Sequence, residues 1–167
     1  KPEGRPQGPD SPAVNAAALE ALRSVWREEL PITNALGIEV AEARDGALVL
    51  RMPLAPNRNH KGTAFAGSLS ALTTLAGWSL LWLALREAGA EAHVVIQDSQ
   101  MQYLLPVHSD ALATALPPAP EAMAHLLESL RRHGRGRVGV EVVVRDVGGV
   151  EVARFGGRYV IGRAPML

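Results

Sequence analysis

The sequence predicts one α+β domain in which a long buried helix is wrapped by a curved antiparallel sheet. The first observation is a run of 24 residues without any charge, residues 62–85. The second is a set of short alternating segments on both sides of that run, the pattern of strands that bury one face. The third is the shortness of the turns between these segments, such as Asp45-Gly46, because antiparallel strands need only two linking residues.

Composition limits the possible functions. The 167 residues fit one domain, and the hydrophobic content of 47% allows a sizeable core. Seventeen basic residues balance seventeen acidic ones, which argues against nucleic acid or anionic lipid as a partner. The absence of cysteine excludes disulfides, zinc–thiolate sites and thiol nucleophiles. The first apolar stretch lacks the basic lead-in of a signal peptide, so a cytoplasmic location is expected.

The N-terminal region divides into a tail and a helix. Residues 1–12 are rich in proline and glycine and are expected to form a flexible tail. The domain proper is predicted over residues 13–163, with a first amphipathic helix over 13–30 packed on it. Ser11-Pro12 has the character of a helix N-cap, and Pro31 ends the helix. Because the chain begins with Lys1, a fused domain such as an acetyltransferase before it stays an open alternative.

The charge-free run has two interpretations. Its length suffices for a membrane span, which needs about 20 apolar residues. A helix that is apolar on all faces can equally be the core of a globular domain, and the flanking alternating strands favour this second interpretation. Gly89 is the expected end of the helix. The other expected strands and helix cover residues 37–43, 47–54, 93–105, 109–116, 121–132 (helix), 135–146 and 150–162.

The segment 93–105 changes phase along its length. Its apolar positions are even at Val94 and Ile96 and odd at Met101 and Tyr103. Since side chains alternate strictly in a regular strand, an extra residue is predicted near positions 98–100. Such a β-bulge often re-aims a side chain beside a functional site.

Several motifs together resemble a known family. They are Asn59-His60-Lys61-Gly62-Thr63-Ala64-Phe65-Ala66-Gly67-Ser68-Leu69, then Gly77-Trp78, and later Asp98-Ser99 and Tyr103-Leu104-Leu105-Pro106-Val107. Residues 30–163 resemble the thioesterase family typified by the C-terminal domain of bacterial YiiD, within the hotdog superfamily. The resemblance implies a hotdog fold, an acyl-CoA or acyl-carrier-protein thioester as substrate, and a homodimer or dimer of dimers with the substrate in a tunnel at the interface.

The sequence departs from well-studied hotdog thioesterases at two points. Those enzymes often carry His-Gly-Gly before the helix, where this chain has Phe65-Ala66-Gly67. They also carry an acidic residue about two turns into the helix, where this chain has Thr74, and no Asp or Glu occurs between Asp45 and Glu87. These departures favour one alternative to a thioesterase, a non-catalytic acyl-CoA-binding or sensing domain. A second alternative is an acyl-thioester dehydratase or hydratase, which would use a histidine with an acidic residue, and the lack of an acidic partner for His60 on the helix counts against it.

The predicted catalytic residues are Asp98, Asn59, Gly67 and Ser68. Backbone N–H groups around Gly67 and Ser68 at the helix start can polarise a thioester carbonyl, although Gly67 can equally serve close packing. Asp98, in an apolar strand beside the bulge, is the best general base if it is partly buried. Otherwise its carboxylate caps a turn or accepts hydrogen bonds from backbone groups at the bulge. Asn59 can hold water or the thioester oxygen, or it can simply form a turn.

The predicted substrate-binding residues are Arg58, His60, Lys61, Thr63, Phe65, Thr74 and Tyr103. The first three form a basic cluster suited to the phosphates of coenzyme A. A second basic run, Arg131, Arg132, Arg135 and Arg137, is more typical of a solvated face. No cofactor is expected apart from coenzyme A as part of the substrate. No metal site is expected either, because the five histidines lack ligand spacing.

Overall fold

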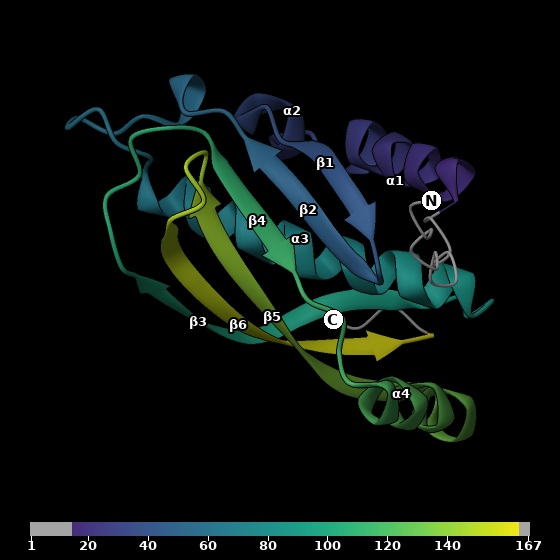
Figure 1. Ribbon diagram of the computed structural model, residues 1–167. Helices are drawn as coiled ribbons and strands as arrows, with labels where there is room; N and C mark the ends of the chain where they lie inside the picture. The colour runs from purple at the N-terminus through teal and green to yellow at the C-terminus, as the bar shows by residue number, and fades with distance from the viewer. Residues whose placement is uncertain (1–14, 164–167) are drawn as a thin grey trace, which may run out of the picture.

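The computed structural model describes residues 15–163 as one curved antiparallel sheet around a long helix (Figure 1). The helices are α1 (Ala16–Glu29), α2 (Ile32–Leu36), the 3-10 turn η1 (Ala55–Asn57), α3 (Ala66–Glu87) and α4 (Pro120–His133). The strands are β1 (Glu39–Arg44), β2 (Ala47–Met52), β3 (His93–Tyr103), β4 (Ala111–Ala115), β5 (Arg135–Asp146) and β6 (Glu151–Gly162). Their order in the sheet is β1-β2-β4-β5-β6-β3, and every neighbouring pair is antiparallel.

Helix α3 forms the centre of the core. It contacts five of the six strands, from β2 to β6, and also α1. It is long and apolar enough to cross a membrane, but 61% of its most apolar window is buried inside the protein. This burial favours the core-helix interpretation of the charge-free run.

Close packing of α3 on the sheet depends on Gly77. A Cβ atom at this position would lie 2.8 Å from Cζ of Tyr159, a fully buried residue of β6. The Tyr159 hydroxyl donates a 2.9 Å hydrogen bond to the carbonyl oxygen of Thr74 on α3. Burial raises the pKa of Tyr159 above its ordinary value.

Two local predictions are confirmed. Asp45 and Gly46 both have positive φ, 54° and 76°, as a two-residue hairpin turn between β1 and β2 requires. The register between β3 and β6 shifts between Ile96 and Asp98, so the phase change does mark a bulge. The extra residue is Gln97, which lies before Asp98 and not within 98–100 as the sequence suggested.

The first helix begins later than expected. Asn15 is its N-cap and accepts a 2.9 Å hydrogen bond from the N–H of Ala17. The predicted cap Ser11-Pro12 and the predicted tail, residues 1–12, lie outside the described residues. Asparagine caps helices as well as serine does, so the rule that predicted Ser11 does not distinguish it from Asn15. The five-residue α2 was not predicted.

Strand β3 lies at one edge of the sheet and is paired on one side only, to β6. The valines of β5, Val138, Val140, Val142 and Val144, are instead buried in the core of the same chain. This valine face is therefore not available to contact a second copy. Within residues 15–163 the two edge strands of the sheet are β1 and β3, and β3 is the longer, with eleven residues against six.

Candidate active site

The loop before α3 is built on Asn57. This residue is 2% exposed, and its Nδ2 donates hydrogen bonds of 2.8 Å to the carbonyl oxygens of Leu36 and Pro53. Its own carbonyl oxygen accepts a 2.7 Å hydrogen bond from the N–H of Phe65. Asn57 thus fixes the base of the loop and the point where α3 begins.

The tip of the loop is a turn organised by Asn59. Its Oδ1 accepts hydrogen bonds from the N–H groups of Lys61 (2.9 Å) and Thr63 (3.2 Å), and its Nδ2 donates to Oγ1 of Thr63 (2.9 Å). Both ends of the Asn59 amide therefore serve the loop itself. The predicted role of Asn59 in holding water or substrate stays a prediction, and these bonds favour the structural alternative.

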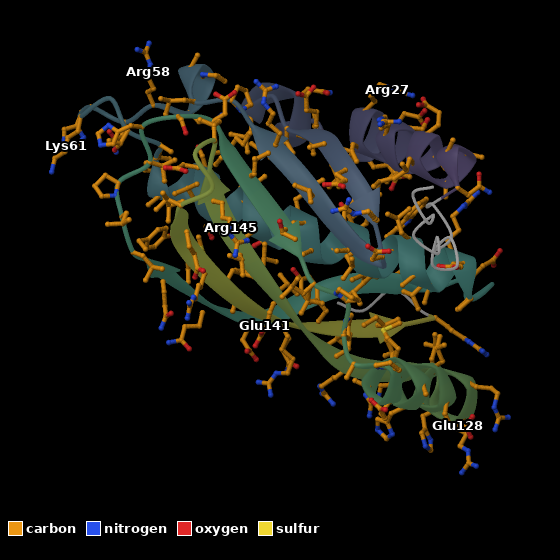
Figure 2. All side chains as sticks on the ribbon, in the orientation of Figure 1. Arg27, Arg58, Lys61, Glu128, Glu141 and Arg145 are labelled. Atoms are coloured by element: carbon orange, nitrogen blue, oxygen red, sulfur yellow. The ribbon has the colours of Figure 1, made fainter. Side chains whose placement is uncertain are left out.

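The basic side chains of this loop point outward. Arg58, His60 and Lys61 are exposed, and Figure 2 shows Arg58 and Lys61 projecting from the loop away from the sheet. They form no ion pair within the described part of the chain. The loop therefore presents positive charge beside the first turn of α3.

The first turn of α3 has unused hydrogen-bond donors. Phe65 is the N-cap and supplies no side-chain hydrogen bond, and the first helical bond runs from the N–H of Leu69 to the carbonyl oxygen of Phe65. The N–H groups of Ala66, Gly67 and Ser68 consequently have no acceptor among the described residues. Ala66 and Gly67 are exposed, whereas Ser68 is buried.

The ring of Phe65 lies directly over Gly67. A Cβ at Gly67 would come within 2.9 Å of Cζ of that ring, although the Phe65 side chain is itself 55% exposed. Gly67 thus leaves space next to the first amides, and in this structure the ring occupies it. Because more than half of the Phe65 side chain is exposed, a ligand can displace the ring without opening the core.

The end of β3 reaches the same point. The Tyr103 hydroxyl donates a 3.2 Å hydrogen bond to the carbonyl oxygen of Ala66. One step back on the same strand face, Sδ of Met101 lies 3.7 Å from Oγ1 of Thr73 on α3. Tyr103 and Phe65 together form an exposed aromatic rim around the first turn of α3.

Asp98 points the other way. Because the bulge is at Gln97, the side chains of Met101 and Tyr103 face α3, and that of Asp98 falls on the opposite face of β3. Its carboxylate pairs with Arg158 of β6, with Nε 2.8 Å from Oδ2, and its side chain is 55% exposed. The condition of partial burial that the general-base role required is therefore not met. Its role as general base stays a prediction that this placement does not favour.

Thr74 and Ser68 complete the predicted set. Thr74 is half-buried two turns into α3, and its carbonyl oxygen accepts the hydrogen bond from Tyr159. The structure therefore brings together Asn59, Thr63, Phe65, Gly67, Ser68 and Tyr103 at the start of α3. It leaves Asp98 on the outer face of the sheet.

Sequence reasoning missed Asn57, for which the only signal was a second asparagine two residues before Asn59.

The described hollows lie elsewhere in the single chain. Four of the hollows on the surface formed by residues 15–163 lie away from the first turn of α3, and none of these four includes it. No group of three or more histidine, aspartate or glutamate side chains within residues 15–163 is arranged to hold a metal ion.

Comparisons with known proteins agree with this architecture. The model of the "Putative thioesterase (yiiD_Cterm)" family matches residues 19–163. The crystal structure of protein OLEI01261 of unknown function from Chlorobaculum tepidum TLS has a TM-score of 0.84 and 27% identity, over 89% of this chain and 99% of that chain. A putative thioesterase from Shewanella oneidensis has a TM-score of 0.79 and 31% identity, over 87% of this chain and 98% of that chain.

A more distant structure shares the fold alone. The PaaI protein of the phenylacetic acid degradation operon of E. coli has a TM-score of 0.66 and 17% identity, over 92% of this chain and 97% of that chain. The family match covers both the first turn of α3 and the strand β3 that reaches it. The chain therefore has the hotdog fold and belongs to the family of putative thioesterases typified by the C-terminal domain of YiiD.

Proposed function

We propose that this protein hydrolyses acyl thioesters of the acyl-CoA class, with the start of α3 polarising the thioester carbonyl. The observation that carries the proposal is the set of N–H groups of Ala66, Gly67 and Ser68, which lack acceptors in the described chain. They lie at the positive end of a 22-residue helix, where negative charge is stabilised. The thioesterase family match supports this chemistry.

Hydrolysis develops negative charge on the thioester carbonyl oxygen, the atom that the N–H groups at the start of α3 would contact. Water adds to the thioester carbon, the carbonyl oxygen becomes negative, and the carbon–sulfur bond then breaks to release a thiol and a carboxylic acid. Preformed donors stabilise that oxygen in the transition state, and one such donor contributes about 10²–10³ in rate in a known enzyme. Once the Phe65 ring moves aside, Gly67 allows the carbonyl to approach, because no Cβ projects there.

The charge around the first turn suits coenzyme A as the thiol component. Arg58, His60 and Lys61 are exposed on the adjacent loop and can meet phosphate groups. The exposed rings of Phe65 and Tyr103 offer apolar contact to the acyl or pantetheine portion. Thr63 and Thr74 are retained as substrate-contacting candidates.

A second copy of the chain is part of the proposal. Strand β3 has eleven residues and an unpaired edge, and such an edge in a soluble protein is ordinarily covered or paired. Pairing of two β3 edges would place a partner chain beside the exposed Phe65, Tyr103, Leu104 and Leu105. This supports a homodimer in which the partner closes the substrate site.

One observation favours a second candidate function. No aspartate or glutamate occurs in residues 46–86, so neither the loop nor α3 up to its last turn carries a carboxylate to activate water. The same donors and basic loop would then bind an acyl-CoA without cleaving it, as in a sensing domain.

A single experiment separates these functions. Acyl-CoAs of graded chain length are incubated with the purified protein, thiol release is followed, and binding is measured in parallel by calorimetry. Turnover supports the thioesterase, and the preferred chain length follows from the series. Binding without turnover supports the sensing domain. If the protein neither binds nor cleaves any of the acyl-CoAs, the result contradicts both functions for this substrate class.

A further inference from the structure

A hollow of about 1120 Å³ lies at the end of the molecule remote from the loop before α3. It is bounded by α4 and by the adjoining ends of β5 and β6, and Figure 1 shows α4 opposite that loop. Strand β3 runs from this end to the start of α3, about 30 Å for its eleven residues. Apart from Ser129, the polar side chains that line the hollow are His125, His133, Arg135, Arg137 and Arg163, and all five can donate hydrogen bonds.

The hollow lies where β5 is flanked by helix α4 and not by a neighbouring strand on that side. Strand β4 pairs only with the second half of β5, from Val142 to Asp146. The first half of β5 is flanked by α4 instead, where the Ser129 hydroxyl donates a 2.8 Å hydrogen bond to the carbonyl oxygen of Arg135. Gly136 is packed so closely on α4 that its Cβ would lie 2.8 Å from Cδ1 of Leu126.

Three arginines of the hollow have no acidic partner in the described chain. Arg135, Arg137 and Arg163 appear in none of its ion pairs, and Arg137 has only a neutral partner, with Nε 3.1 Å from Oε1 of Gln97. Glu91 lines an adjoining hollow with Arg163 but forms no ion pair with it. The lining of the larger hollow contains no carboxylate.

The neighbouring arginines of the same sequence run behave differently. Arg131 and Arg132 both pair with Glu128 on α4, and Figure 2 shows Glu128 projecting from α4 away from the sheet. The basic run of the sequence thus divides in two: Arg131 and Arg132 are neutralised by Glu128, whereas Arg135 and Arg137 have no acidic partner among the described residues. Uncompensated like charges on one surface cost stability unless an anion joins them.

We propose that this hollow binds a phosphate-bearing ligand. Guanidinium groups match phosphate oxygens with paired hydrogen bonds, and the two histidines add further donors on the α4 side. The volume exceeds that of inorganic phosphate and accommodates a nucleotide with more than one phosphate. The ligand is either a free nucleotide or the nucleotide portion of coenzyme A, which share this chemistry. Binding here does not depend on hydrolysis at α3.

The test is calorimetric titration of the intact protein with adenosine 3′,5′-bisphosphate, ADP and inorganic phosphate at low salt. The Arg137→Ala and Arg163→Ala variants are expected to bind the nucleotide ligands about tenfold more weakly each, because each removes a charge-assisted contact. Arg131→Ala is the matched control, since its guanidinium is already paired with Glu128, and it should bind like the parent. Binding should weaken as salt rises.

The outcomes distinguish the source of the ligand. Adenosine 3′,5′-bisphosphate binding more tightly than ADP, together with a raised KM for acyl-CoA in Arg137→Ala, assigns the hollow to coenzyme A. Equal binding of both nucleotides with an unchanged KM assigns it to a free nucleotide. No binding of any of the three ligands by the parent protein, or equal binding by all variants, overturns the proposal. Neither of these two overturning results bears on whether the protein hydrolyses thioesters.

Discussion

The hydroxyl of Tyr159 on β6 donates a 2.9 Å hydrogen bond to the carbonyl oxygen of Thr74 on α3 and joins the sheet to the central helix. Tyr159 is fully buried, and its ring packs against Gly77. Replacing it by phenylalanine removes the hydroxyl and leaves the Gly77 surface less well packed. Tyr159→Phe should lower the free energy of unfolding by about 1–2 kcal/mol. Urea denaturation measures this, with Tyr103→Phe, which alters an exposed hydroxyl, as control. An unchanged midpoint would contradict the structural role.

The same phenol predicts sensitivity to alkali. Burial raises the pKa of Tyr159 above the ordinary value of 10.0, so the unfolded chain loses this proton at a lower pH than the folded chain. The contribution is present below pH 10 and declines as pH rises through the range between the two pKa values. The free energy of unfolding should therefore fall above about pH 10. The fall should be smaller in Tyr159→Phe, and equal falls in both proteins would refute the assignment.

The fold could be predicted because burial leaves a periodic signal. The charge-free run became α3, and the alternating valines of β5 became one buried face. The short α2 was not predicted because five residues give too little periodicity to distinguish a helix from a loop. The N-cap was misplaced because Ser11 and Asn15 satisfy the same local rule.

The site was predicted less well because one residue decides which way a strand side chain points. A bulge placed after Asp98 would leave its carboxylate facing α3. The structure places the extra residue at Gln97, and Asp98 turns to the outer face. The sequence shows that a phase change exists, but its position within a few polar residues depends on the pairing with β6. The residues of the loop and helix start were predictable because they are adjacent in the chain.

A methyl group at Gly67 should test the proposed carbonyl site. In Gly67→Ala the new Cβ displaces the Phe65 ring and lies beside the first amides of α3. Thioester turnover should fall at least about tenfold, while stability holds or rises because alanine favours helices. Gly156→Ala is the matched control, since its Cβ would meet nothing within 4 Å. Full activity in Gly67→Ala would remove the first turn of α3 from the mechanism.

The unpaired edge of β3 should mediate self-association. Sedimentation is expected to give about twice the chain mass of 17.8 kDa at micromolar concentration. Val95, 42% exposed on this edge strand, is a suitable position for disruption. Val95→Lys should weaken the dimer at least about tenfold, because a lysine on an edge opposes strand pairing. Val147→Lys, in the β5–β6 turn, is the control and should stay dimeric. A monomeric parent protein would contradict the proposed assembly.

Asp98 offers the sharpest test of how water is activated. Its carboxylate is paired with Arg158 on the face of β3 opposite to α3, so the structure gives it no contact with the first turn of the helix. Asp98→Asn should therefore keep kcat/KM within about threefold of the parent, whereas loss of a true general base costs about 10²–10⁴. The Arg158→Gln variant breaks the same pair from the other side and should match it in both activity and stability. A loss of a hundredfold or more in Asp98→Asn alone, at unchanged thermal stability, would show that Asp98 leaves Arg158 and activates water. A small and equal effect in both variants would remove Asp98 from water activation.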